Sequence, residues 1–204
     1  IGLASRIHGV ACTVFVPVGN NPEKNAAIRA YGATLEEGGH DFDEARERCE
    51  QRAADTGARY VHSANEPLLI AGVGTYALEV FESLPTADVV LVAIGGGSGA
   101  CGLITVRNAL GAKTRIIGVG AVNAPALERS WRGPERIVGE SANTFAEGVA
   151  TRVTFDLTFG ILKQHLDDFV LLSEDELAEG VRLALRTTHN LAEGAGSASI
   201  AAAL

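Results

Sequence analysis

The fold is decided by one stretch of the sequence, Val89-Val90-Leu91-Val92-Ala93-Ile94-Gly95-Gly96-Gly97-Ser98-Gly99-Ala100-Cys101-Gly102. Its six apolar residues are typical of a strand buried on both faces, and residues 100–111 are typical of a helix. The glycines between them favour a turn whose backbone N–H groups converge at the helix N-terminus, where the helix dipole adds partial positive charge. The sequence therefore predicts a phosphate-binding loop, the alternative being a tight turn that binds nothing.

The composition is that of a globular protein and argues against several classes of partner. The 204 residues are 47% hydrophobic and 21% charged, with a net charge of −8. This negative balance disfavours binding to nucleic acid or to an anionic membrane surface. No apolar run approaches the roughly 18 residues of a membrane span. We therefore expect no nucleic-acid partner, no membrane partner and a cytoplasmic location.

The cysteines and histidines do not form a recognisable site. The three cysteines, Cys12, Cys49 and Cys101, are far apart, so they offer neither a zinc pair nor an even disulfide framework. The five histidines share no metal-binding spacing. We expect reduced thiols, no metal site and no catalytic cysteine.

Strand-like and helical segments alternate along the chain, which predicts an α/β fold with mostly parallel sheets flanked by helices. Two lobes are expected: a small α/β lobe over residues 1–65, and a large-lobe portion over residues 66–204 that carries the glycine loop. A cleft between two such lobes is a common place for a cofactor. The expected strands are 11–16, 33–36, 59–62, 89–94, 115–120 and 169–172, and the expected helices are 1–7, 22–31, 41–56, 69–84, 100–111, 124–131, 155–165, 174–188 and 197–204.

Two acidic stretches have a structural explanation. Asp41 is placed to cap the helix that follows it, and Gly57 to end that helix. Ser173 and Glu176 have the spacing of a capping box. We favour capping over acid–base chemistry for the acidic cluster that runs from Asp167 to Glu176.

Several further segments, in order and at matching spacing, resemble one enzyme family. The glycine loop and these segments together are similar to the pyridoxal-phosphate (PLP) dependent serine/threonine dehydratases over essentially all 204 residues. The resemblance implies a two-lobed tryptophan-synthase-β-like fold (fold type II). The segments are Asn20-Asn21-Pro22-Glu23-Lys24, His62-Ser63-Ala64-Asn65-Glu66-Pro67, Ile70-Ala71-Gly72-Val73-Gly74-Thr75, Phe145-Ala146-Glu147-Gly148-Val149-Ala150 and Leu191-Ala192-Glu193-Gly194-Ala195-Gly196.

The resemblance also implies a reaction and a site. The family eliminates water and ammonia from L-serine or L-threonine to give a 2-oxo acid, with PLP linked to a lysine. It implies a small amino-acid substrate and a homodimer or higher homo-oligomer. Gly148 matches a position beside the cofactor ring, and Glu193 an acidic residue near its pyridine side. The residues that match the phosphate-binding loop are Gly95, Gly96, Gly97, Ser98 and Gly99.

The chain also departs from the family pattern. The matching lysine and the substrate-binding motif would precede Ile1, and the residue contacting the pyridine nitrogen would follow Leu204. We therefore expect a fragment of a longer protein, truncated at both ends. Lys24, Lys113 and Lys163 lie in other contexts, so no catalytic residue is expected within the chain, which is predicted to be inactive by itself.

The departures leave alternatives open. The positions that match a divalent-cation site in some relatives are Gly120, Ala124 and Ala126, which lack the required carboxylates. One alternative is a non-catalytic binding or scaffold fragment. An amino-acid racemase of the same fold is a second alternative to the dehydratase.

Overall fold

The computed structural model describes all 204 residues, which divide into two compact units, Ile1–His62 and Ser63–Leu204. The sequence placed this division after residue 65. Each unit has its own parallel sheet flanked by helices, so the predicted α/β class is confirmed. None of the helices has both the length and the apolar character needed to cross a membrane.

The first unit is built on a sheet of two parallel strands that pair from Thr13 opposite Thr34 to Val16 opposite Glu37. Side chains define its helix starts: Asn21 accepts hydrogen bonds from the N–H groups at the start of one helix, and Asp41 does so at the next. The elements are α1 (Gly2–His8), β1 (Thr13–Val16), α2 (Pro22–Ala30), β2 (Thr34–Glu37) and α3 (Phe42–Thr56).

The strand predicted at Arg59–His62 is wrong, because this segment has no strand conformation. A strand exists only where its backbone groups find a ladder partner, and a pattern of four residues carries no information about one. The sheet of this unit contains only β1 and β2. Within the segment, the rings of Tyr60 and His62 make an edge-to-face contact at 5.9 Å between centroids.

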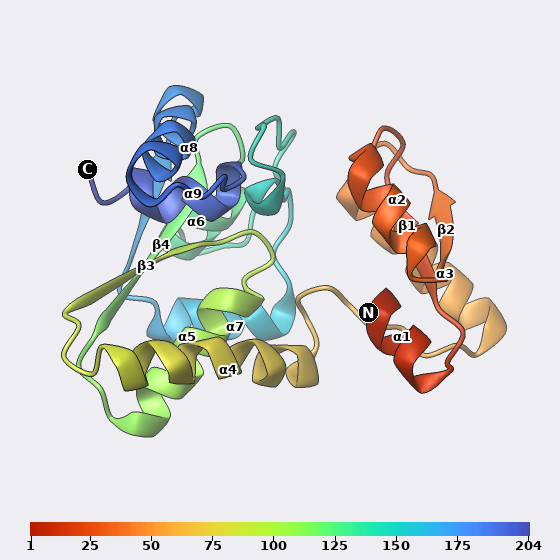
Figure 1. The fold of residues 1–204 in the computed structure, drawn as a ribbon, viewed down its shortest axis with the longest axis horizontal. Helices are drawn as coiled ribbons and strands as arrows, with labels where there is room; N and C mark the ends of the chain where they lie inside the picture. The colour runs from red at the N-terminus through yellow and green to blue at the C-terminus, as the bar shows by residue number, and fades with distance from the viewer. The chain divides into compact units, whose positions relative to one another are not determined.

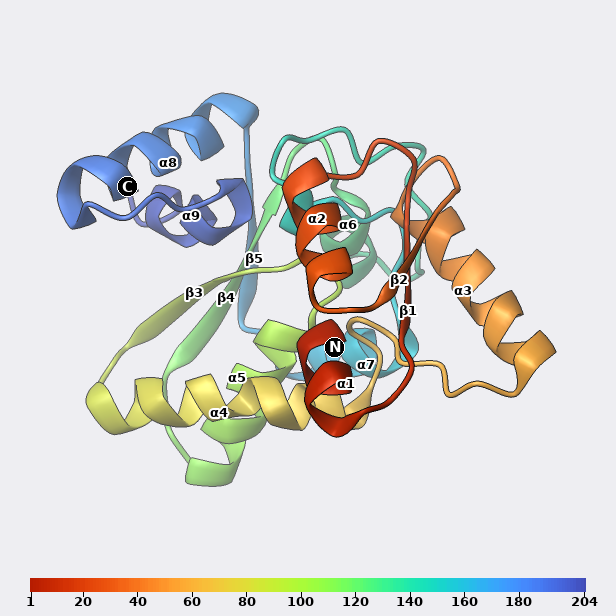
Figure 2. The same ribbon diagram turned by 45° about the vertical axis from the view of Figure 1, so that its right-hand side comes forward.

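The second unit has a three-stranded parallel sheet in the order β3-β4-β5. Figures 1 and 2 show α4, α5 and α7 on one face of this sheet, and α8 and α9 on the other. The elements are α4 (Pro67–Ser83), β3 (Val89–Ala93), α5 (Ser98–Leu110), β4 (Arg115–Ala121), α6 (Ala126–Arg132), the 3-10 helix η1 (Glu147–Val149), α7 (Asp156–His165), β5 (Asp168–Leu172), α8 (Glu174–Thr188) and α9 (Gly194–Ala201).

Two apolar cores hold the helices of this unit to the sheet. Leu103, Ile116 and Leu162 are at most 1% exposed in the core shared by α4, α5, α6 and α7. Val119 and Leu177 are fully buried in the core beneath α8 and α9. Burial on both faces explains why β3 is apolar throughout and why β4 and β5 carry a charged residue only at their first position, Arg115 and Asp168.

The helix boundaries follow their caps. The predicted capping box is confirmed, since Ser173 and Glu176 exchange both of its hydrogen bonds at the start of α8. Helix α9 begins at Gly194 and not at Ser197 as predicted, because the Glu193 carboxylate caps it. The short helix η1 was not predicted.

Candidate functional site

The glycine loop joins β3 to α5 as the sequence predicted. The first backbone hydrogen bond within α5 runs from the Cys101 N–H to the Gly97 carbonyl at 2.9 Å. The amides of Ser98, Gly99 and Ala100 therefore precede the first intrahelical bond. Gly97 occupies the N-cap position and provides no side-chain cap. The positive end of the 13-residue α5 dipole is thus available to an anion.

Three of the four loop glycines are required by the protein itself. A methyl group on Gly95 would collide with the carbonyl oxygen of Gly148. A methyl group on Gly96 would lie 2.5 Å from the Cβ of Ala64. Gly97 has a φ of 93°, a left-handed conformation that side chains disfavour. These three residues would have to be glycine whether or not a ligand binds.

Gly99 is different, because nothing in the protein requires a glycine there. It is the second residue of α5, and a methyl group on it would have no neighbour closer than the Tyr76 hydroxyl at 3.8 Å. Alanine would favour the helix by about 0.5–1 kcal/mol. A glycine at this position is consistent with a ligand that approaches the backbone closely.

Gly148 and Glu193 lie beside the loop. A methyl group on Gly148 would lie 2.7 Å from the Cβ of Ala195 and 3.4 Å from Oε1 of Glu193. The Glu193 carboxylate accepts hydrogen bonds from the amides of Ala195 at 3.1 Å and Gly196 at 3.0 Å. Through the Gly95–Gly148 contact, the structure brings all the predicted site residues to one region of the second unit.

Three residues of this region were missed by sequence reasoning. Thr158 is 1% exposed and would lie 3.1 Å from a methyl group on Gly97. The Thr151 hydroxyl lies 3.5 Å from the Gly95 carbonyl oxygen. The Tyr76 hydroxyl donates a hydrogen bond to the Gly99 carbonyl at 3.0 Å. All three contacts join distant parts of the chain, so no local pattern could have revealed them.

The lysines of the second unit lie away from the loop. Lys113 connects α5 to β4, at the amino end of the strands, whereas the loop follows the carboxyl end of β3. The Lys163 ammonium donates hydrogen bonds to the carbonyls of Trp131 and Gly133, the latter at 2.8 Å. Lys24 belongs to α2 of the first unit.

The other candidate groups have structural partners. Asp167 accepts hydrogen bonds from Arg107 at 2.6 Å and from the Ile116 N–H at 2.7 Å. Arg107 is only 9% exposed, so this pair ties α5 to the sheet. Burial raises the pKa of the Cys101 thiol to about 12, and the side chain packs in the core.

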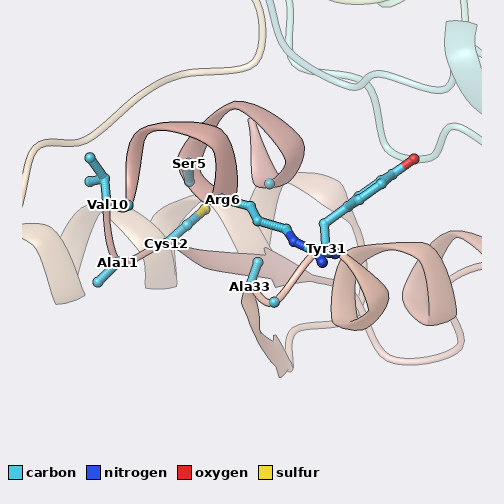
Figure 3. A pocket seen from close by; sticks show the side chains of 10 residues that line it. Ser5, Arg6, Val10, Ala11, Cys12, Tyr31 and Ala33 are labelled. Carbon is cyan, nitrogen blue, oxygen red and sulfur yellow. The ribbon is translucent and has the colours of Figure 1, made fainter.

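The first unit has a surface pocket of about 270 Å³ between α1 and the residues that follow α2 (Figure 3). Arg6 lies within it, but its guanidinium already donates a hydrogen bond to the Ala30 carbonyl at 3.2 Å. Tyr31 and the Cys12 thiol line the same pocket. It contains none of the residues that the sequence predicted for the site.

Comparison with known proteins supports the resemblance. The pattern of the family described as "Pyridoxal-phosphate dependent enzyme" matches residues 1–204. The chain is 35% identical over 206 residues to an L-threonine ammonia-lyase of Thermotoga maritima and 36% identical over 204 residues to one of Geobacter sulfurreducens. Each match covers 100% of this chain and 51% of the relative, so the chain spans about half the length of these relatives.

A solved structure shows the same fold. The processed threonine deaminase isoform 2 of Solanum lycopersicum superposes with a TM-score of 0.90 at 26% identity, covering 98% of this chain and 58% of the other. The predicted tryptophan-synthase-β-like arrangement is thereby confirmed for the part of the fold that the chain represents.

The residues of the loop fit the phosphate of PLP. That group is a dianion of small size, and it needs several N–H donors together with a backbone that it can approach closely. The uncapped start of α5 offers the amides of Ser98 and Gly99, which are half-buried, and Gly99 leaves space beside them. The family pattern matches residues 1–204 and the loop fits the cofactor's phosphate, so the chain belongs to the pyridoxal-phosphate dependent enzyme family.

Proposed function

We propose that the chain is part of a PLP-dependent ammonia-lyase that eliminates water and ammonia from L-serine or L-threonine to give a 2-oxo acid. Two relatives that are 35% and 36% identical to it are L-threonine ammonia-lyases. The observation that carries the proposal is the uncapped start of α5 together with Gly99, which packing within the protein does not require.

Each site residue has a proposed task. The amides of Ser98 and Gly99 and the Ser98 hydroxyl would bind the phosphate group, and Gly95, Gly96 and Gly97 give the loop the shape that this requires. Gly148 presents backbone to the ring. Glu193, whose carboxylate two amides hold in place, supplies negative charge near the pyridine side. When bound, PLP supplies the electron sink that makes removal of the α-proton possible.

The 204-residue chain by itself is proposed to be inactive. The reaction needs a lysine at the cofactor, and the positions of Lys113 and Lys163 support the view that neither serves. Purified chain mixed with PLP is expected to release no 2-oxo acid from L-serine or L-threonine. Turnover that disappears when Lys24, Lys113 or Lys163 is replaced by alanine would overturn this part of the proposal.

Binding of the cofactor's phosphate can be tested without turnover. Equilibrium dialysis of the chain against PLP is expected to give saturable binding that inorganic phosphate displaces. Gly99→Ala is expected to weaken this binding. Gly160→Ala is the matched control, because Gly160 is an exposed helical glycine of α7 with no atom within 4 Å of an added methyl group. Equal binding by wild type and both variants would contradict the proposed role of the loop.

A further inference from the structure

Asn65 caps a helix that lies far from it in the sequence. Helix α7 begins without a side-chain cap of its own, since its N-cap residue is Phe155. The Leu157 N–H in its first turn instead donates a hydrogen bond to Oδ1 of Asn65 at 2.8 Å, across 92 positions of sequence. This oxygen satisfies one of the N–H groups that the first turn of a helix leaves without an intrahelical partner. The start of α7 is therefore held to the segment that precedes α4.

The first turns of α7 form one wall of the glycine loop. A methyl group on Gly97 would lie 3.0 Å from Cδ1 of Leu162 and 3.1 Å from the Cβ of Thr158. A methyl group on Gly96 would lie 3.5 Å from Cε2 of Phe155, the N-cap residue of α7. Thr158 is only 1% exposed, so this wall is closely packed. A shift in the start of α7 would therefore change the space that the Gly96–Gly97 peptide occupies.

The residue before Asn65 contacts the same loop directly. Ala64 is 3% exposed, and its Cβ would lie 2.5 Å from a methyl group on Gly96. Residues 64–65 thus contact the loop through Ala64 and contact α7 through Asn65. The hydrogen bond from Leu157 to Asn65 joins the two segments that lie against Gly96.

The backbone at Gly96 and Gly97 decides where the next two amides point. Gly97 is the N-cap residue of α5, and Ser98 and Gly99 are the first two residues of that helix. Both are half-buried, and their N–H groups are the proposed phosphate donors. A hydrogen bond weakens steeply when its donor turns away from the acceptor, so an anion bound by two amides depends on their direction.

We propose that Asn65 is a positioning residue of the phosphate site. By capping α7 it holds the wall against which Gly96 and Gly97 pack, and so fixes the direction of the two amides that follow. The inference rests on the proposed function, because it requires an anion at the start of α5. It adds to that function a residue that lies outside the glycine loop and acts on the ligand through the backbone of the loop.

The test is an NMR titration of the full 204-residue chain with inorganic phosphate, in which the Ser98 and Gly99 amide protons are the reporters. Asn65→Ala removes the cap. It is expected to bind phosphate about fivefold more weakly, with smaller shifts of both amides, because the donors are no longer aligned with the anion. Asn65→Gln moves the oxygen by one methylene group and is expected to behave in the same way, so it carries the test if Asn65→Ala does not fold.

Asn65→Asp keeps an oxygen where the Leu157 N–H needs an acceptor. It is expected to restore the affinity for phosphate to within about twofold of the wild type, because aspartate caps helices as well as asparagine does. An Asn65→Asp variant that binds phosphate as weakly as Asn65→Ala would show that the cap on α7 is not what the site requires.

The cap of another helix in the same unit supplies the control. Ser173 accepts a hydrogen bond from the Glu176 N–H at the start of α8, which lies on the opposite face of the sheet from α7 (Figures 1 and 2). Ser173→Ala therefore loses a helix cap but is expected to bind phosphate as the wild type does. Asn65→Ala with the affinity and amide shifts of Ser173→Ala would overturn the inference.

Failure of the inference can be separated from failure of the proposed function. If phosphate shifts the Ser98 and Gly99 amides of the wild type and Gly99→Ala weakens binding while Asn65→Ala has no effect, only the role of Asn65 is wrong. If phosphate leaves these two amides unmoved in the wild type, both proposals are wrong.

Discussion

The first three glycines of the loop and Gly99 are glycines for different reasons. Gly95 and Gly96 face atoms that leave no space for a methyl group, and Gly97 has a left-handed backbone. Gly99 has helical backbone and open space beside it. The structure therefore separates three glycines that the fold requires from one that the packing of the protein does not require. We propose that a ligand requires this fourth glycine.

Gly95→Ala is expected to have the largest effect of the loop substitutions. The added methyl group collides with the carbonyl oxygen of Gly148. Because the methyl carbon is attached to one backbone segment and the oxygen belongs to another, neither atom can move without moving its backbone. We expect the free energy of unfolding to fall by about 3 kcal/mol, near the upper end for overpacking. Urea denaturation measures this. A loss below about 1 kcal/mol would show that the loop can shift to accept a side chain, so that Gly95 is not required by packing as stated above.

Gly97→Ala comes next. Its φ of 93° costs a side chain about 1–2 kcal/mol, and the methyl group would also lie 3.0 Å from Cδ1 of Leu162 and 3.1 Å from the Cβ of Thr158. Thermal denaturation is expected to show a clear loss of stability. Gly111→Ala is a control for the backbone term alone, because Gly111 has a φ of 66° and no atom within 4 Å of an added methyl group. Equal losses in the two variants would mean that the contacts with Leu162 and Thr158 contribute nothing.

Gly99→Ala separates stability from binding. It is expected to leave the free energy of unfolding unchanged or to raise it by up to about 1 kcal/mol, since alanine favours a helix. The affinity for PLP is expected to fall about tenfold, or about 1.4 kcal/mol, because the methyl group weakens a charge-assisted hydrogen bond to the phosphate. Denaturation without ligand and equilibrium dialysis with PLP give the two numbers. If Gly99→Ala loses stability but keeps its affinity for PLP, the fold and not the ligand requires a glycine at this position.

Among the substitutions expected to destabilise the protein, Glu193→Gln is expected to have the smallest effect. The glutamine keeps an acceptor for the amides at the start of α9 but loses the negative charge that suits the helix dipole, a change of about 0.5–1 kcal/mol. Thermal denaturation compared with Ser173→Ala, which breaks the capping box of α8, checks the size of this effect. If Glu193→Gln loses more thermal stability than Ser173→Ala, the charge of Glu193 stabilises the protein by more than a helix cap does.

The features predicted correctly from sequence are those with a local cause. The apolar run before Gly95 predicts β3, and the spacing of Ser173 and Glu176 predicts the start of α8. The strand at Arg59–His62 is wrong because pairing depends on a distant partner. Gly148, which contacts Gly95, was named only through the resemblance to a family, and the contact of Gly99 with Tyr76 was not predicted, because both contacts join residues far apart in the chain.

The central claim is that the amides at the start of α5 bind the phosphate of PLP. A crystal structure of the 204-residue chain grown with PLP tests it most directly. The account predicts phosphate oxygens within about 2.7–3.2 Å of the nitrogens of Ser98 and Gly99, which is hydrogen-bond distance. A cofactor phosphate bound elsewhere on the chain, with these two amides hydrogen-bonded to other groups of the protein, would contradict it.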